Sequence, residues 1–513
     1  MKYRLIGSTL IYISALLLGL GTTLFINKSY YIALLLGAPL TAIILRVTHD
    51  KSLAFKFFAI LTISSIMSSP IVSFYVPAHI ISSFIRGEIL ESPLALEILS
   101  DLKLGDVSST PLLIVIAMWS AIVLSQFMLT YAVYLVLRNF WASIERLPNP
   151  YFRACSTTSI SFYTGKIGSL VAALAGTGTG LGVTFLSVSH LLLFFSISLL
   201  STLSFIMTFI LGLGASQLVD YNFTLGAYTG LLIYVLAFAA ISRRRYIAFD
   251  VNLPAPATLL LLSVLTATPL LFFLAALNTA FLLGIYIVVS ILTAIVMLRF
   301  EGEYSLLALI ELTAITHSKW SCLYLSGGVY EVIPNKAISS VIVFPISTLL
   351  TYIGTLLAAS ALREVGKVRK FEGVAPLAIA AFLSTFLSAL YYFRIKPGEV
   401  AVFSLPLECK PSILNLDMKM FLLGLGVTLL LSFIYIIGGR VPLNPAGFTL
   451  GVTVGVLYPS QYPQTIAVLA LSIVLKYILI GVLKIETGKT IELFSMFFWG
   501  NITGLTLSTL ISP

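Results

Sequence analysis

The sequence predicts an all-α polytopic membrane protein, and two observations support this prediction. Apolar runs long enough to cross a bilayer recur from residue 5 almost to the C-terminus. Of the 513 residues, 59% are hydrophobic and 10% charged, with a mean hydropathy of +1.05, which is far from the balance of soluble proteins. Because a helix needs roughly 20 apolar residues to cross the hydrocarbon core, we expect about 14 to 16 transmembrane helices. The runs do not alternate at period two, which favours helices over a barrel.

The first elements are placed by hydropathy and by charge. The run from Leu5 to Phe25 lacks a cleavage site followed by a soluble domain, so we interpret it as a retained helix rather than a signal peptide. Short loops rich in Lys and Arg stay in the cytoplasm. Basic residues in the N-terminal segment and in four loops therefore mark the cytoplasmic side: Lys2, Arg4; Arg46, Lys51, Lys56; Arg138, Arg146, Arg153; Arg243, Arg244, Arg245; Arg363, Lys367, Arg369, Lys370. The acidic segment from Pro77 to Pro111 is expected outside, which places the N-terminus inside.

We expect one membrane domain over 1–513, made of an N-terminal half (1–245) and a C-terminal half (246–513). A short internal sequence similarity supports related halves. Two similar segments each follow an apolar segment: Arg146-Leu-Pro-Asn149-Pro-Tyr-Phe and Arg440-Val-Pro-Leu-Asn444-Pro-Ala-Gly447-Phe. Matching turns in two halves are typical of duplicated transporter folds. Chance similarity is the alternative, since Asn-Pro and Gly occur in loops everywhere.

The stretch from Ser159 to Leu181 is rich in glycine and hydroxyl residues, including Gly176, Gly178 and Gly180. The charge pattern requires an odd number of crossings between Arg153 and Asp220. One crossing with a re-entrant hairpin satisfies this, as do three short helices. Broken backbone at membrane depth is tolerated where it lines a wet cavity. The alternative is that these glycines allow close helix packing.

Several segments, among them the two Asn-Pro sequences, carry a family resemblance. The segment from Arg440 to Leu450, the helix around Ser472 to Ile480, and Lys489 to Gly500 resemble the C-terminal part of prokaryotic proteins related to the oligopeptide transporter superfamily. The sequence Arg138-Asn-Phe-Trp-Ala-Ser-Ile-Glu-Arg-Leu-Pro-Asn-Pro-Tyr resembles their N-terminal part. The resemblance implies a proton-coupled symporter of small peptides or metal chelates, and it implies that Lys476 matches a lysine of the family.

Ionisable residues inside apolar segments are costly and are therefore candidates for function. Glu311 lies within an apolar run and is the best candidate for a buried carboxylate that exchanges a proton, because desolvation raises a carboxyl pKa. The alternative is a contact with a loop lysine. His190 either relays protons or donates to a helix carbonyl. Lys476 either balances charge in the membrane or lies nearer the interface.

The other motifs exclude several classes of function. The cysteines and histidines have no metal-ligand spacing, so we expect no metal and no cofactor. No basic stripe interleaves with aromatic residues, which argues against nucleic-acid binding. His-Glu-x-x-His and Gly-x-Ser-x-Gly are absent, so we expect no enzyme.

The predicted function is secondary active transport of a small solute, driven by a coupling ion through alternating access, in the cell membrane. Asn149 and Asn444 would shape half-helix ends, and Gly176, Gly178, Gly180 and Gly447 would let the solute reach backbone. Two alternatives stay open: a non-catalytic subunit or scaffold of a larger complex, and a lipid-carrier-dependent transferase that uses the external acidic segment. The sequence also leaves open whether the protein forms a homo-oligomer.

Overall fold

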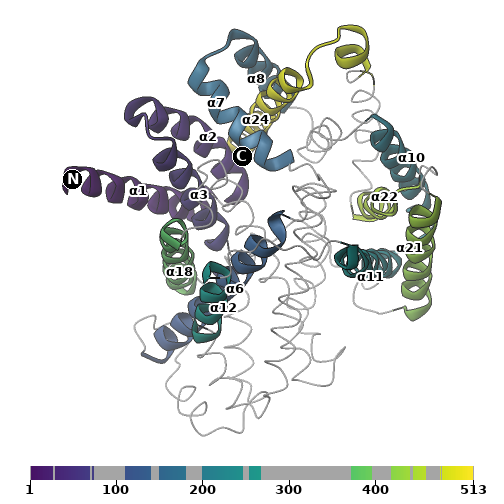
Figure 1. Ribbon diagram of the computed structural model, residues 1–513, viewed down its shortest axis with the longest axis horizontal. Helices are drawn as coiled ribbons and strands as arrows, with labels where there is room; N and C mark the ends of the chain where they lie inside the picture. The colour runs from purple at the N-terminus through teal and green to yellow at the C-terminus, as the bar shows by residue number, and fades with distance from the viewer. Residues whose placement is uncertain are drawn as a thin grey trace, which may run out of the picture. The chain divides into compact units, whose positions relative to one another are not determined.

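The computed structural model describes residues 2–26, 29–69, 72–73, 110–139, 150–180, 199–245, 254–266, 371–394, 417–438, 443–457, 474 and 477–511 (Figure 1). Within these ranges the regular elements are all helices, with no strand. This confirms the predicted all-α fold class. The number of crossings and the orientation in the bilayer stay predictions.

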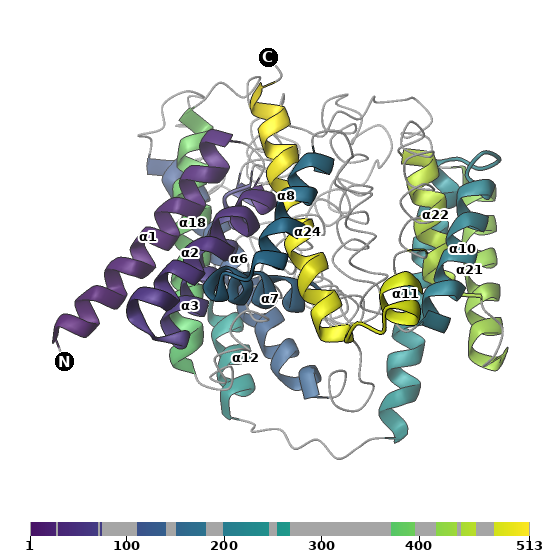
Figure 2. The ribbon, with the colours of Figure 1, turned by 90° about the horizontal axis from the view of Figure 1, so that it is seen from above.

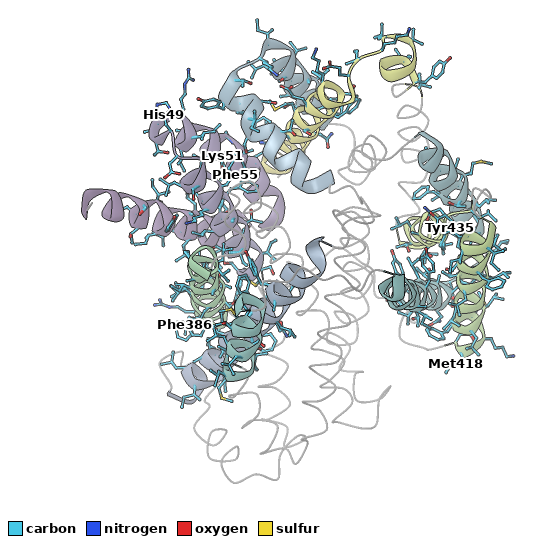
Figure 3. All side chains as sticks on the ribbon, in the orientation of Figure 1. His49, Lys51, Phe55, Phe386, Met418 and Tyr435 are labelled. Atoms are coloured by element: carbon cyan, nitrogen blue, oxygen red, sulfur yellow. The ribbon has the colours of Figure 1, made fainter. Side chains whose placement is uncertain are left out.

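Four of the described helices are long and apolar enough to cross a membrane. Their candidate spans are Gly7–Leu24, Leu113–Ala132, Val374–Arg394 and Met418–Ile437. The last span is the most exposed, with only 17% of its window buried. Met418 and Tyr435, which Figure 3 labels near the two ends of this helix, are both exposed. Such an apolar surface is suited to lipid.

The chain divides by its contacts into two compact units, and each unit takes segments from both sides of residue 245. Unit 1 comprises Met1–Phe140, Val251–Leu298 and Trp320–Glu408, and unit 2 comprises Trp141–Asp250, Arg299–Lys319 and Cys409–Pro513. The described helices of unit 1 are α1 (Lys2–Ile26), α2 (Ser29–Thr48), α3 (Lys51–Met67), α6 (Thr110–Asn139), α12 (Pro254–Thr266) and α18 (Phe371–Arg394).

In unit 1, α3 is the central helix. It packs against α1, α2 and α18, while α6 packs against α12 and α18 (Figure 2). Every residue from Ala54 to Met67 except Lys56 is buried. Close packing with α1 depends on Gly19, where a Cβ atom would lie 2.7 Å from the Ser64 Cβ. Beside it, the Thr23 hydroxyl donates to the Ser65 carbonyl at 3.0 Å.

The start of α3 follows from local chemistry. Asp50 precedes the helix in extended conformation, and its carboxylate accepts the backbone N–H groups of Ser52 and Leu53. This side chain satisfies two of the four N–H groups that a helix start leaves without partners. His49 has a left-handed φ of 51°, which turns the chain sharply between α2 and α3. Lys51 places its Nζ 5.9 Å from the centre of the Phe55 ring (Figure 3).

Unit 2 contains a larger set of described helices. They are α7 (Pro150–Thr164), α8 (Ile167–Gly180), α10 (Leu199–Ala215), α11 (Tyr221–Arg245), α21 (Met418–Gly438), α22 (Pro445–Leu457), the short π-helix η4 (Tyr477–Val482) and α24 (Thr487–Ile511). Helix α24 lies along α8 and contacts α7, whereas α11 packs with α21 and α10 with α22 (Figures 1 and 2). Each of these pairs joins a segment that ends at or before residue 245 to one that begins after residue 417.

Candidate functional site

The predicted site residues are only partly within the described chain. Glu311, Lys476, His190 and Asn149 lie outside the described residues, so their proposed roles stay predictions. Asn444 lies just before α22, where its side-chain oxygen accepts the N–H groups of Ala446 at 3.0 Å and Gly447 at 3.3 Å. Asn444 is therefore the N-cap of α22, as its position before Pro445 at the first helical residue favours.

The glycine-rich stretch is helical where it is described. Gly176, Gly178 and Gly180 all belong to α8, and the turn between α7 and α8 is made by Gly165, whose φ of +62° favours glycine. Gly176 lies in the contact with α24, where a Cβ atom would lie 2.8 Å from the carbonyl carbon of Phe497. Gly178 faces open space. Gly176 thus serves close helix packing.

The end of α3 in unit 1 is the most polar part of the described interior. Helix α3 ends at Met67, three residues before Pro70 in the sequence, because a residue that precedes proline is disfavoured in helical conformation. Side chains from two other helices bind the backbone here. The Tyr392 hydroxyl of α18 donates to the Ser68 carbonyl at 2.9 Å, and the indole N–H of Trp119 in α6 donates to the Val72 carbonyl at 2.8 Å. We call this region the α3 node.

The α3 node joins the last turns of α3 and α18. Tyr392 lies in the final turn of α18, and it reaches Ser68, the C-cap of α3. The Ser73 hydroxyl donates back to the Met67 carbonyl, which satisfies another group at the helix end. Helix C-termini carry partial negative charge, so two helix ends that meet favour a cation or a positively charged group.

Three serine hydroxyls in or next to the α3 node are buried and have no partner among the described residues. The side-chain oxygens of Ser64, Ser69 and Ser388 make no hydrogen bond, as far as the described chain shows. All three residues are at most 3% exposed. Ser388 lies one turn before Tyr392 on the same face of α18. By contrast, the Ser384 hydroxyl, a further turn back, donates to Ala380 of its own helix. A buried hydroxyl without a partner costs on the order of 1–3 kcal/mol.

Unit 2 holds the best-defined charged group among the described residues. The Glu492 carboxylate of α24 accepts the hydroxyls of Ser161 in α7 and Ser169 in α8, both at 3.1 Å, and pairs with the Lys166 Nζ at 3.0 Å. It thereby ties the α7–α8 turn to α24. Glu492 lies outside the four candidate spans. Partial burial alone would raise its pKa, but the hydrogen bonds from Lys166, Ser161 and Ser169 and the Lys166 charge together hold the pKa below its usual range.

Metal binding has no support in the part of the chain that the structure describes. There, no three His, Cys, Asp or Glu side chains come together as ligands. The polar side chains buried there are neutral, being mainly serine and threonine with a few amides. The described interior therefore offers neutral oxygen and amide groups for binding.

Together, the all-helical fold and the four candidate spans define a multi-pass membrane protein. Comparisons with protein families, with curated proteins and with solved structures found no match to this chain. The resemblance to oligopeptide transporters therefore stays an expectation from the sequence.

Sequence reasoning missed the α3 node and the Glu492 group. The serines from Ser64 to Ser73 stand at an unusual density just before and after Pro70, which is the signal that could have indicated a broken, polar helix end. Glu492 lies six residues into α24, and nothing in its neighbouring sequence indicates Ser161 or Ser169, which are more than 300 residues away.

Proposed function

We propose that this protein is a secondary active transporter of a small polar solute, such as a short peptide or a metal chelate, and that part of the solute or ion path lies at the α3 node. The observation that carries the proposal is the set of buried serine hydroxyls without described partners, at the point where α3 ends before Pro70. Irregular backbone inside a helical membrane protein is tolerated where it is buried in protein or lines a wet cavity.

The chemistry of the α3 node favours a neutral or positive group. Ser69 and Ser388 offer oxygen atoms that can accept or donate, and the two helix ends add partial negative charge. A cation or an ammonium group of the solute would use both. Arg394 in the last turn of α18 is exposed, so it does not compete inside the node. Glu311 stays the proposed proton carrier and Lys476 the proposed balancing charge.

The experiment is flux into proteoliposomes that carry the purified protein. Acidification of the lumen is followed on addition of pooled short peptides or metal chelates. We expect substrate-dependent acidification that falls at least tenfold in Ser69→Ala and Ser388→Ala proteins, because each change removes an oxygen that the solute or ion would use. Ser384→Ala is the matched control, since its hydroxyl already bonds its own helix. This control should retain flux within about twofold.

Two outcomes would contradict the proposal. Absence of flux with every pool, from protein shown to be folded, would favour the non-catalytic subunit or scaffold. Equal flux in the Ser69→Ala, Ser388→Ala and control proteins would remove the α3 node from the path while leaving transport in place. Glu311→Gln, measured in the same assay, tests the proton carrier separately.

A further inference from the structure

Three helix pairs of unit 2 cross in the same way. In each pair one glycine from each helix faces the backbone of the other helix, and a Cβ atom at any of these glycines would clash with a carbonyl group or an amide nitrogen. The glycines are Gly176 and Gly500 for α8 with α24, Gly212 and Gly451 for α10 with α22, and Gly226 and Gly424 for α11 with α21. The closest atom is always a carbonyl oxygen of the partner helix.

The register of the three crossings is identical. Each glycine faces the carbonyl oxygen of the residue three positions before the partner's glycine: Gly212 faces Phe448, and Gly451 faces Phe209. The same holds for both other pairs. In five of the six helices the sequence is Phe-x-x-Gly, and α8 has Ala173 in place of the phenylalanine. One local sequence therefore makes one kind of crossing three times.

The paired helices run in the same direction. In α11 with α21, a Cβ on Gly226 would lie 3.0 Å from the Leu425 nitrogen, and one turn later a Cβ on Gly230 would lie 3.1 Å from the Thr428 Cβ. In α10 with α22, Gly455 faces Ser216, one turn after the Gly451 crossing. In α8 with α24, Gly168 lies nearest Leu493, before the crossing. Contacts that advance together along both helices define parallel pairs.

The chain order of these helices fits two copies of one segment, with α8 matched to α21, α10 to α22 and α11 to α24. Among the described residues the two copies are not packed alike, since α22 contacts α11 and α21 whereas α10 makes no comparable contact with α24 or α8, and the short helix η4 lies only between α22 and α24. The matched glycines nevertheless face the partner backbone at similar Cβ distances. A Cβ on Gly176 would lie 2.8 Å from the Phe497 carbonyl carbon, and one on Gly424 would lie 2.9 Å from that of Phe223.

The matched helices also share sequence. Residues 223–231 read Phe-Thr-Leu-Gly-Ala-Tyr-Thr-Gly-Leu, and residues 497–505 read Phe-Phe-Trp-Gly-Asn-Ile-Thr-Gly-Leu, with the same residue at Phe, both Gly, Thr and Leu. Residues 174–178 of α8 and 422–426 of α21 both read Leu-x-Gly-x-Gly. The second glycines of this motif, Gly178 and Gly426, both face open space.

We propose that unit 2 contains two copies of one three-helix segment, α8–α10–α11 and α21–α22–α24, which pair with each other at the three glycine crossings, and that these crossings stay closed while transport proceeds. The duplication stands on the glycine contacts and the sequence matches alone. The second part, a fixed frame against which other segments move, rests on the proposed function.

We expect the crossings to stay closed because the two backbones of each pair approach each other closely. Small residues allow such approach in membrane helices, and the contacts are made by backbone groups rather than by side chains that can change rotamer. Sliding one helix by a single residue replaces the glycine by a residue with a Cβ, which the partner carbonyl does not admit. We infer that alternating access does not separate these pairs, so that the six helices stay together as the frame against which other segments move.

The test uses pairs of introduced cysteines in a protein whose Cys155, Cys322 and Cys409 are replaced by serine. Gly230→Cys with Thr428→Cys reports the α11–α21 pair, because the Cβ positions lie 3.1 Å apart and a disulfide needs about 3.5–4.5 Å, which a shift of a few tenths of an ångström provides. When the copies are aligned on their crossing glycines, Thr428 matches Gly180 and Gly230 matches Gly504. Gly180→Cys with Gly504→Cys must therefore also form a disulfide.

Mild oxidation is followed by mass spectrometry of the digested protein. We expect a disulfide in both pairs and none in the matched control, Gly178→Cys with Gly504→Cys, since Gly178 faces open space. A disulfide in the Gly230→Cys and Thr428→Cys protein without one in the Gly180→Cys and Gly504→Cys protein would overturn the duplication. If the Gly180→Cys and Gly504→Cys protein is not monodisperse, Thr177→Cys with Gly504→Cys is used in its place, together with a short thiol cross-linker. Thr177 matches Leu425, and Leu425 faces Gly230.

Flux measured on the same proteins separates the two parts of the proposal. The oxidised Gly230→Cys and Thr428→Cys protein is expected to keep flux within about twofold of its reduced form. Loss of flux on oxidation that reduction restores would overturn the fixed frame and leave the duplication standing. If the cysteine-free protein shows no flux with any pool, the proposed function and the fixed frame are both contradicted. The disulfide pattern then still tests the duplication.

Discussion

Replacing Gly212 by alanine tests the close helix crossings of unit 2 most directly. The new methyl carbon would lie 2.9 Å from the Val452 nitrogen and closer still to the Phe448 carbonyl oxygen, whereas a carbon and an oxygen atom keep about 3.3 Å in the tightest favourable contacts. Helix α10 must therefore move away from α22 by on the order of 1 Å, which forfeits about a quarter to a half of each dispersion contact across the interface.

Overpacking of this kind costs about 1–3 kcal/mol. Gly214 provides the matched control, because it lies in the same helix and a Cβ there meets no atom within 4 Å. Gly214→Ala should be neutral or stabilising by up to about 1 kcal/mol, since alanine loses less backbone entropy in a helix than glycine does. The two variants are therefore expected to differ by about 1–4 kcal/mol in the free energy of unfolding.

The assay is reversible unfolding in mixed micelles with increasing SDS, followed by circular dichroism. If Gly212→Ala unfolds at the same SDS fraction as the parent protein, the backbone contact with Phe448 is not tight and the reasoning is refuted. Equal destabilisation by Gly214→Ala would also refute it, because the effect would then come from glycine loss in general and not from the crossing.

Three further predictions concern single side chains. The pKa of Glu492 is lowered in the folded protein, so its contribution to stability is complete above the ordinary carboxyl pKa of about 4.3 and is lost as pH falls through the folded pKa. Between pH 6 and 3 the melting temperature of Glu492→Gln should therefore fall less than that of the parent protein. Trp119→Phe removes the donor to the buried Val72 carbonyl and should lower the free energy of unfolding in SDS by about 1–3 kcal/mol. A change below about 0.5 kcal/mol would mean that the hydrogen bond is dispensable. Asn444→Ala removes the N-cap of α22 and should cost about 1 kcal/mol, while Asn444→Asp should retain most of that stability, as measured in the same titration.

The helical membrane fold was predictable because its signal is local. Hydropathy over about 20 residues is enough to indicate an apolar helix, and the candidate spans Leu113–Ala132 and Met418–Ile437 both fall in such runs. The cap at Asn444 is local in the same sense, since an Asn-Pro pair before an apolar stretch favours a helix start. Sequence reasoning placed Asn444 at the end of a half-helix but did not identify its side chain as the cap.

The contacts that build the candidate sites could not be predicted in this way because they join distant residues. Ser69 and Ser388 have ordinary neighbours in sequence, and their burial at one helix end follows only from the packing of α3 with α18. The Phe-x-x-Gly sequences are an intermediate case. They are visible in the printed sequence, but a four-residue motif with one fixed aromatic residue becomes informative only when the contacts show that its members pair with each other.

The sharp turn at His49 has a consequence for the order of folding. Only His49 and Asp50 separate α2 from α3, and the Asp50 carboxylate already fixes the first turn of α3. Contacts between α2 and α3 therefore close a very short loop, at little cost in chain entropy and without any later part of the sequence. This hairpin can form as soon as its last residues have left the ribosome, so that α3 offers α18 a preformed surface when that helix arrives.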